Sequence, residues 1–210
     1  MNDVQFLGGL WFWSHRERRS GLSKPFVVIV TGPSGAGKTT LGKKLSEVLK
    51  IPCISKDDIK EILFETLGWE DRQWSTRLGV ASLEILFHIL ECQVAAGKSA
   101  LVETAFIPQD HTARFLDLRD EYGFEPVQIL CHAADEILFE RFVARVEAGE
   151  RHPGHVDHLT CYDQFAALRR ERGYGALDVG GLLLKVDVTD FETVDMNALI
   201  MAIQKWTGDL

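Results

Sequence analysis

Apolar residues recur with two different spacings from residue 25 onward. Five short runs are almost continuously apolar or β-branched, which is typical of strands buried on both faces; they cover residues 25–31, 52–55, 99–104, 126–132 and 180–189. Seven longer stretches repeat apolar residues every three or four positions and predict helices; they cover residues 40–50, 56–68, 72–96, 111–123, 134–149, 159–173 and 194–206.

Three of the predicted helices carry a defined apolar stripe. The first helix has Leu41, Leu45, Val48 and Leu49 on one face, and the last has Met196, Leu199, Ile200, Ile203 and Trp206. In the long helix the stripe consists of Val80, Leu83, Phe87, Leu90 and Val94, widened by Ile85 and Ile89. We therefore expect the long helix to be largely buried.

The alternation of strands and helices predicts an α/β fold with three layers, α/β/α. Parallel strands need helical crossovers, so the five strands are expected to form one parallel sheet with helices on both faces. Residues 25–210 then make a single domain, and its ligand should bind at the carboxyl ends of the strands. Residues 1–24 are expected to be a leader outside the core, either a disordered tail or an aromatic segment that packs on a neighbour.

A glycine-rich turn follows the first predicted strand. Residues 32–39 read GPSGAGKT and match the pattern G-x-x-x-x-G-K-[ST] without a mismatch. Glycines let the backbone turn and bring its N–H groups to phosphate oxygens, which the helix amino terminus also attracts. Lys38 would reach the β and γ phosphates, and the Thr39 hydroxyl would ligate Mg²⁺. The predicted nucleotide-binding residues are Gly32, Pro33, Ser34, Gly35, Ala36, Gly37, Lys38, Thr39 and Thr40.

This loop makes the chain resemble the P-loop nucleoside-triphosphate hydrolases and kinases. The NKxD and DxxG motifs of the guanine-nucleotide branch are absent, and the third predicted strand ends in the single acid Glu103, not in the acidic pair of motor ATPases. Residues 56–60 read KDDIK. They are similar to a motif of the adenylate-kinase-like group of small-molecule and polynucleotide kinases, which includes kinases of the AAA_33 type. The resemblance implies ATP and Mg²⁺ as cofactors.

The same resemblance assigns roles beside the loop. It implies that Asp57 accepts the proton of the attacking hydroxyl, and that Asp58 and Lys60 contact the acceptor. Phosphoryl transfer depends mostly on positioning and charge stabilisation, so a carboxylate that orients the hydroxyl suits this role. The alternative is that Asp57 or Asp58 caps the second helix. Glu103 corresponds to an acid near the metal or its waters.

Two arginines lie in the predicted helix of residues 134–149. Arg141 and Arg145 are four residues apart and project from the same helical face. In adenylate-kinase-like phosphotransferases, one arginine of the helix before the lid neutralises the transferring phosphoryl and another packs near the adenine. The resemblance places these catalytic roles on Arg141 and Arg145. The alternative is that both form surface salt bridges.

The following loop, GERHPGHVDHLTC, has two interpretations. A Pro-Gly pair supplies a turn and a hinge, which predicts a lid over residues 149–158 that touches substrate or phosphate through Arg151, His152 or His155. The alternative is a metal site, because zinc takes four nitrogen or sulfur ligands. The candidate ligands are His152, His155, His158 and Cys161.

Charge and cysteine content limit the partners. The 210-residue chain has a formal net charge of −8 and no evident basic stripe, so a nucleic-acid partner is not expected. Four scattered cysteines without CxxC spacing favour the cytoplasm over a disulfide framework. The apolar patch from Leu7 to Trp13 is too short to span a bilayer.

The leading interpretation is an ATP-dependent kinase that moves the γ-phosphoryl to a hydroxyl of a small polar molecule. The absence of guanine-reading motifs favours ATP over GTP. A polynucleotide 5′-hydroxyl kinase is the second hypothesis, and it requires a basic groove leading to Asp57. The third is a nucleotide-binding regulatory ATPase that binds a partner through the patch Trp11-Phe12-Trp13.

Overall fold

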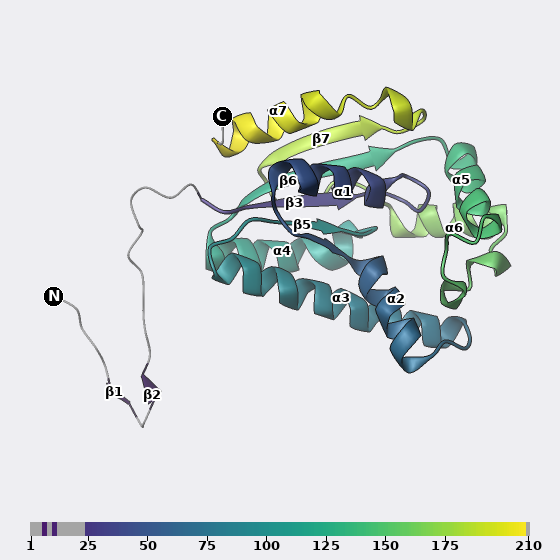
Figure 1. Cartoon of the computed structure of the whole chain (residues 1–210), viewed down its shortest axis with the longest axis horizontal. Coiled ribbons are helices and arrows are strands. Elements are labelled where there is room, and N and C mark those ends of the chain that lie inside the picture. The colour runs from purple at the N-terminus through teal and green to yellow at the C-terminus, as the bar shows by residue number, and fades with distance from the viewer. Residues whose placement is uncertain (1–5, 8–9, 12–23, 209–210) are drawn as a thin grey trace.

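The computed structural model describes residues 6–7, 10–11 and 24–208 of the chain. Its centre is a sheet of five parallel strands in the order β4-β5-β3-β6-β7. The strands are β3 (Phe26–Thr31), β4 (Cys53–Ser55), β5 (Ala100–Glu103), β6 (Glu125–His132) and β7 (Leu182–Asp187). The predicted α/β class and the five-stranded parallel sheet are confirmed (Figure 1).

Helices cover both faces of this sheet and its carboxyl edge. Figure 1 shows α1 (Lys38–Leu49) and α7 (Met196–Thr207) on one face, and α3 (Arg72–Ala95) and α4 (Pro108–Tyr122) on the other. At the carboxyl ends of the strands lie α2 (Lys56–Leu67), α5 (Asp135–Glu147) and α6 (Tyr162–Arg172). Two short 3-10 helices, η1 (Pro153–His155) and η2 (Asp157–Leu159), connect α5 to α6, and η3 (Phe191–Thr193) precedes α7.

The central strand β3 separates two hydrophobic clusters. Val28 and Val30 belong to the cluster that α1, α5, α6 and α7 cover, while Val27 and Ile29 belong to the cluster under α3 and α4. All four valine and isoleucine side chains are fully buried. Burial of each contributes about 1.5–3 kcal/mol, so this strand is a fixed base for the loop that follows it.

The predicted apolar stripes are only partly correct. In α3, Phe87, Leu90 and Val94 are buried, but Val80 is 60% exposed. The buried face continues instead through Leu78 and Ser82, because the Ser82 hydroxyl is satisfied by the Leu78 carbonyl oxygen at 2.5 Å. The expectation that α3 is largely buried is therefore wrong. Val48 of α1 and Trp206 of α7, which were placed on the apolar stripes of their helices, are also exposed.

The apolar character of α3 matters for a second reason. Among the described residues it is the one helix with the length and hydropathy to cross a membrane. Seven of its side chains are buried, and four of them, Leu86, Phe87, Leu90 and Val94, belong to the cluster beneath the sheet. Packing on the sheet accounts for the apolar composition of this helix.

The expected leader lies almost entirely outside the described residues. Within it, β1 (Phe6–Leu7) pairs with β2 (Leu10–Trp11) in antiparallel fashion. Phe12 and Trp13 of the aromatic patch are outside the described residues.

Candidate active site

The glycine-rich loop joins β3 to α1 and takes a backbone path that needs its glycines. Gly35 has φ 81° and Gly37 has φ 67°, both in the left-handed region. A Cβ atom at Gly35 would lie 2.3 Å from the backbone oxygen of Leu138, and one at Gly37 would lie 2.7 Å from the ring of Phe191. The loop is thus wedged between α5 and η3, which fixes the direction of its N–H groups.

The two side chains that end the loop point to different partners. Lys38 donates from Nζ to the carbonyl oxygen of Pro33 at 2.8 Å, so its ammonium group lies within the curve of the loop. Burial lowers the pKa of Lys38, against the attraction of Glu103 and Asp57. Thr39 donates from Oγ1 to Oε2 of Glu103 at 3.1 Å. The loop therefore presents one cation and one hydroxyl–carboxylate pair side by side.

Glu103 is a buried carboxylate at the carboxyl end of β5. Its burial raises its pKa, and the charge of Asp57 adds to this, while Lys38 and hydrogen bonds from Ser55 and Thr39 oppose it. A buried carboxylate in this state gains from a nearby cation.

The first turn of α2 carries both aspartates, but neither caps the helix. Ser55 is the cap, and its hydroxyl accepts from the backbone N–H of Asp58 at 3.3 Å. The alternative that Asp57 or Asp58 caps α2 is therefore wrong. The Asp58 carboxylate lies 3.6 Å from Nζ of Lys43, and both side chains are exposed.

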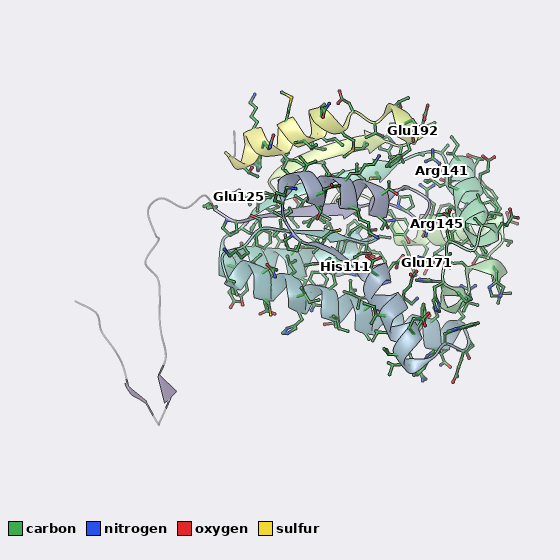
Figure 2. All side chains as sticks on the ribbon, in the orientation of Figure 1. His111, Glu125, Arg141, Arg145, Glu171 and Glu192 are labelled. Carbon is green, nitrogen blue, oxygen red and sulfur yellow. The ribbon has the colours of Figure 1, made fainter. Side chains whose placement is uncertain are left out.

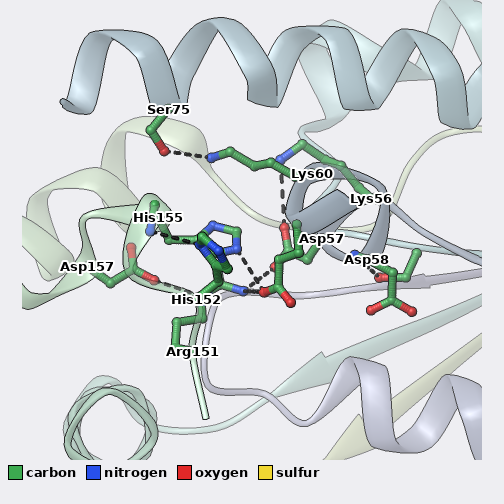
Figure 3. A network of polar contacts seen from close by, with 12 residues as sticks. Lys56, Asp57, Asp58, Lys60, Ser75, Arg151, His152, His155 and Asp157 are labelled. Atoms are coloured by element: carbon green, nitrogen blue, oxygen red, sulfur yellow. Dashed lines mark hydrogen bonds and ion pairs between the residues drawn. The ribbon is translucent and has the colours of Figure 1, made fainter. Parts of the chain in front are cut away.

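Asp57 is paired with the lid arginine. Arg151 donates from Nη1 to Oδ2 of Asp57 at 2.7 Å and from Nε to Oδ2 of Asp157 at 2.9 Å (Figure 3). Nζ of Lys56 lies 3.9 Å from Oδ1 of Asp57. Burial opposes ionisation of Asp57, but the charges of Arg151, Lys56 and His155 outweigh it and hold the pKa of Asp57 well below its usual range.

The lid histidines have carboxylate partners on α2. Nε2 of His152 lies 3.0 Å from Glu65, and Nε2 of His155 lies 3.0 Å from Glu61. Both rings also pack on Phe64, His152 in a stacked arrangement and His155 edge-on. Burial and the charge of Arg151 lower the pKa of His155 to about 2, so this imidazole is neutral near pH 7.

These contacts bear on the metal alternative. His158 and Cys161 are exposed, while His152 and His155 face α2. Over residues 24–208, no group of three or more histidine, cysteine, aspartate or glutamate side chains is arranged to hold a metal ion. The segment instead docks on α2, and a Cβ at Gly154 would lie 2.8 Å from the Phe64 ring.

Lys60 does not face the site as expected. Its side chain is buried, its Nζ donates to the Ser75 hydroxyl of α3 at 2.9 Å, and it lies over the ring of Phe64 (Figure 3). Lys60 therefore joins α2 to α3, and the expectation that it contacts the acceptor is not supported by its position. His152 likewise packs on Phe64 behind the site.

The two arginines of α5 differ in their contacts. Arg141 donates to the carbonyl oxygens of Val188 and Thr189 at 2.6 and 2.9 Å, and so joins α5 to the loop after β7. Arg145 forms no hydrogen bond or ion pair with any residue of the described chain. Neither arginine is in a surface salt bridge within that part, and both face the loop end of α1 (Figure 2).

A cavity of about 650 Å³ brings these groups together. Of the predicted residues, its lining contains Ser34, Gly35, Gly37, Lys38, Thr39, Thr40, Asp57, Asp58, Glu103, Arg141, Arg145 and Arg151. The predicted residues outside the lining are Gly32, Pro33, Ala36, Lys60 and His152. The lining also contains side chains that sequence reasoning missed: Lys43, Glu61, Phe142, Glu150, Asp157 and Phe191.

One of the missed residues carried a readable signal. Glu61 is four positions after Asp57, so both project from the same face of α2. Asp157 and Phe191 carried none, because their places depend on how the lid and the loop after β7 fold back.

Known proteins resemble this chain in sequence and fold. The AAA_33 family model, described as an AAA domain, matches residues 27–170. A protein of Pyrococcus abyssi named "Probable adenylyl-sulfate kinase" is 37% identical over 145 residues, which is 66% of this chain and 76% of that protein. The crystal structure of a "putative kinase" from Chloroflexus aurantiacus is 38% identical, with a TM-score of 0.78, and covers 87% of this chain and 98% of its own.

A more distant structure shares the fold alone. The APS kinase of Mycobacterium tuberculosis, solved in complex with AMPPNP and APS, is 17% identical with a TM-score of 0.55. The match covers 88% of this chain and 98% of that one.

Proposed function

The chain belongs to the AAA_33 family of P-loop proteins and is a phosphotransferase, and we propose that it moves the γ-phosphoryl of ATP to a hydroxyl of a small polar molecule. The observation that carries this proposal is the shared cavity. It joins the phosphate loop, which follows β3, to the carboxylate of Asp57, which lies in the first turn of α2 just after β4. Both positions are at the carboxyl edge of the parallel sheet.

The loop residues fit a triphosphate with Mg²⁺. Gly35 and Gly37 have positive φ, and a Cβ on either would clash with Leu138 or Phe191, so the loop keeps the tight backbone path that can direct N–H groups to phosphate oxygens. The Thr39 hydroxyl and the buried Glu103 carboxylate, 3.1 Å apart, are hard oxygen donors of the kind that Mg²⁺ prefers together with phosphates and water. When bound, Mg²⁺ supplies charge neutralisation for the phosphates. We propose that Thr39 and Glu103 hold it.

The transfer step balances without a further reactant. The acceptor hydroxyl oxygen forms a bond to the γ-phosphorus, the bond from that phosphorus to the β–γ bridging oxygen breaks, and ADP leaves with the electron pair. The hydroxyl proton passes to the Asp57 carboxylate and then to solvent. We propose that Lys38 contacts the phosphates and that Arg145, which has no ion pair among the described residues, stabilises the charge that develops during transfer.

Arg141 has a different proposed role. Because its guanidinium already binds two carbonyl oxygens, it fixes the loop at Val188 and Thr189. We propose that Arg141 shapes the nucleotide side of the cavity. The guanidinium of Arg145 then acts as the cation on the transferring phosphoryl.

We take the pairing of Asp57 with Arg151 as the closed state of the proposed lid. A carboxylate in an ion pair at 2.7 Å is a weak base. In this proposal Arg151 and Asp58 border the acceptor, and the hydroxyl replaces Arg151 at Oδ2 of Asp57 while Arg151 stays bound to Asp157. Excluding water is the general use of such a lid.

Asp57→Asn provides the test. Loss of the carboxylate removes the proton acceptor, which contributes about 10²–10⁴-fold in such reactions. We expect phosphoryl transfer to fall by about that factor, while the Kd for ATP stays within about twofold because Asp57 lies outside the phosphate loop. Transfer is followed with labelled ATP and a panel of nucleosides, sugars, amino sugars and adenylyl sulfate. Transfer that survives in the variant refutes the role of Asp57.

The remaining expectations join this proposal. A small-molecule acceptor, no nucleic acid and a cytoplasmic location agree with the net charge and with scattered free cysteines. The regulatory ATPase would show steady ATP hydrolysis with no transfer to any compound of the panel.

A further inference from the structure

The side chains that line the cavity bear on the charge of the acceptor, the substrate that receives the phosphoryl group. A nucleotide at the phosphate loop would leave the side chains of α2, the lid and Lys43 of α1, which lies 3.6 Å from Asp58, for the acceptor. We call these side chains the acceptor part of the cavity. Five acidic side chains line this acceptor part: Asp57, Asp58, Glu61, Glu150 and Asp157. The basic side chains there are Lys43 and Arg151. Even when Lys56, which lies 3.9 Å from Asp57, is counted with them, these side chains carry more acidic than basic groups.

Both basic side chains of the acceptor part are already paired. Arg151 binds Asp57 at 2.7 Å and Asp157 at 2.9 Å, and only 16% of its side chain is exposed. Lys43 lies 3.6 Å from Asp58. Lys60, the further basic residue of α2 that would suit an anionic acceptor, is directed to Ser75. Among α2, the lid and Lys43, an anionic acceptor would therefore need to break an existing ion pair to find a cation. The guanidinium of Arg145, which has no ion pair among the described residues, is assigned to the transferring phosphoryl.

Glu61 has a neutral hydrogen-bond partner and no cation within hydrogen-bond distance among the described residues. Its Oε1 accepts from His155 at 3.0 Å, but that imidazole is neutral. The guanidinium of Arg151 is 3.9 Å away and is committed to two other carboxylates. Burial raises the pKa of Glu61 and the charges of Asp57 and Asp58 add to this, while those of Arg151 and His152 oppose it. A further cation beside Glu61 would favour its ionised form.

We propose that the acceptor is a hydroxyl compound with a cationic amine, which the carboxylates of α2 and the lid recognise. Glu61 is the specificity-determining residue, and the amine takes no part in the transfer. The hydroxyl still attacks the γ-phosphorus, and ADP still leaves with the electron pair. This inference rests on the proposed kinase function. It separates the chain from an adenylyl-sulfate kinase, because adenylyl sulfate is an anion.

Matched acceptors test the inference. Each set holds an amine, a neutral compound and a carboxylate on one framework: ethanolamine, ethylene glycol and glycolate, or glucosamine, glucose and glucuronate. Adenylyl sulfate completes the panel. We expect kcat/KM for the amine of at least one set to exceed that of its neutral match by about tenfold or more, the scale of one partly buried charge pair. Binding of the same compounds, with a non-hydrolysable ATP analogue present, is measured by calorimetry.

The chain offers a matched pair of variants. Glu61→Gln and Glu65→Gln each change a glutamate of α2 that accepts from a lid histidine at 3.0 Å, and glutamine can still accept in both. Only Glu61 lines the cavity. We expect Glu61→Gln to lower the amine-to-neutral ratio of kcat/KM by about tenfold, and Glu65→Gln to leave it unchanged.

The outcomes separate the two proposals. Transfer that favours a carboxylate or adenylyl sulfate overturns the inference and keeps the kinase function. An amine preference that is equal in wild type and Glu61→Gln overturns the role of Glu61. Steady ATP hydrolysis without transfer to any compound overturns the kinase function, and the inference falls with it.

Discussion

The ion pair between Arg151 and Asp57 makes a quantitative prediction about the lid. Arg151 is largely buried, with 16% of its side chain exposed, whereas Asp57 has 38% exposed. Breaking a fully buried pair costs about 3–5 kcal/mol, and an exposed pair contributes about 0–1 kcal/mol. For a half-buried pair with a 2.7 Å contact, we therefore expect a coupling energy of about 1–2 kcal/mol.

A double-mutant cycle measures this energy without nucleotide. The free energy of unfolding is determined by urea denaturation for wild type, Arg151→Ala, Asp57→Ala and the double variant. The control is the same cycle for Lys43 and Asp58, which line the same cavity at 3.6 Å but have 62% and 52% of their side chains exposed. Its coupling should stay below about 0.5 kcal/mol.

The pH dependence follows from the direction of the pKa shift. The pKa of Asp57 is held below its usual range, so the unfolded chain binds this proton first as the pH falls. The stabilisation by this pair is fully present above the unfolded pKa of about 3.9 and declines as the pH falls from there through the lower folded pKa. We expect the coupling energy to be constant from pH 7 down to about pH 4 and to become smaller below that pH. A coupling energy between Arg151 and Asp57 below about 0.3 kcal/mol at pH 7 would refute the proposed closed lid.

Two further predictions concern the loop and helix α2. Thr39→Val should raise the Mg²⁺ concentration for half-maximal transfer by about tenfold or more, since it removes the hydroxyl that faces Glu103, and Mg²⁺ titration of the initial rate measures this. Thr66→Val, at an exposed position of α2 outside the cavity lining, is its control. Lys60→Met should leave KM for the acceptor unchanged, because Lys60 points to Ser75. Burial lowers the pKa of Lys60 to about 8, so the unfolded chain binds more protons above that pH and stability rises from pH 8 toward 10. Urea denaturation at pH 7.5 and 9.5 should show a smaller rise in Lys60→Met; an equal rise in both proteins would contradict the buried position.

The sequence predicted those parts of the fold whose cause is local. The strand of residues 26–31 is buried on both faces, so its side chains form a continuous apolar run that periodicity detects. The phosphate loop is equally local, because its glycines and Lys38 serve their roles within one turn. The buried face of α3 was misread because Ser75 and Ser82 look polar in sequence, although both hydroxyls are satisfied inside the structure.

The candidate site was predicted where strands position it and missed where loops do. Asp57 and Glu103 follow parallel strands directly, so the common edge of the sheet brings them together. The side chain of Lys60 was assigned by analogy with a motif, and the motif does not show whether the long stem turns toward the cavity or toward α3. Asp157 comes into the site through the positive φ of 60° at Val156, which no local pattern announces for a β-branched residue.

The hydrogen bonds of Arg141 to the carbonyl oxygens of Val188 and Thr189 join two segments that lie outside the proposed acceptor part. They tie the middle of α5 to the loop after β7, while the acceptor side is carried mainly by residues 56–67 and 149–160. Duplicated genes could therefore diverge in acceptor choice through changes in those two segments while ATP use is inherited intact. For protein engineering, the same two segments are the ones to exchange between relatives, with Arg141 and its two hydrogen bonds left in place.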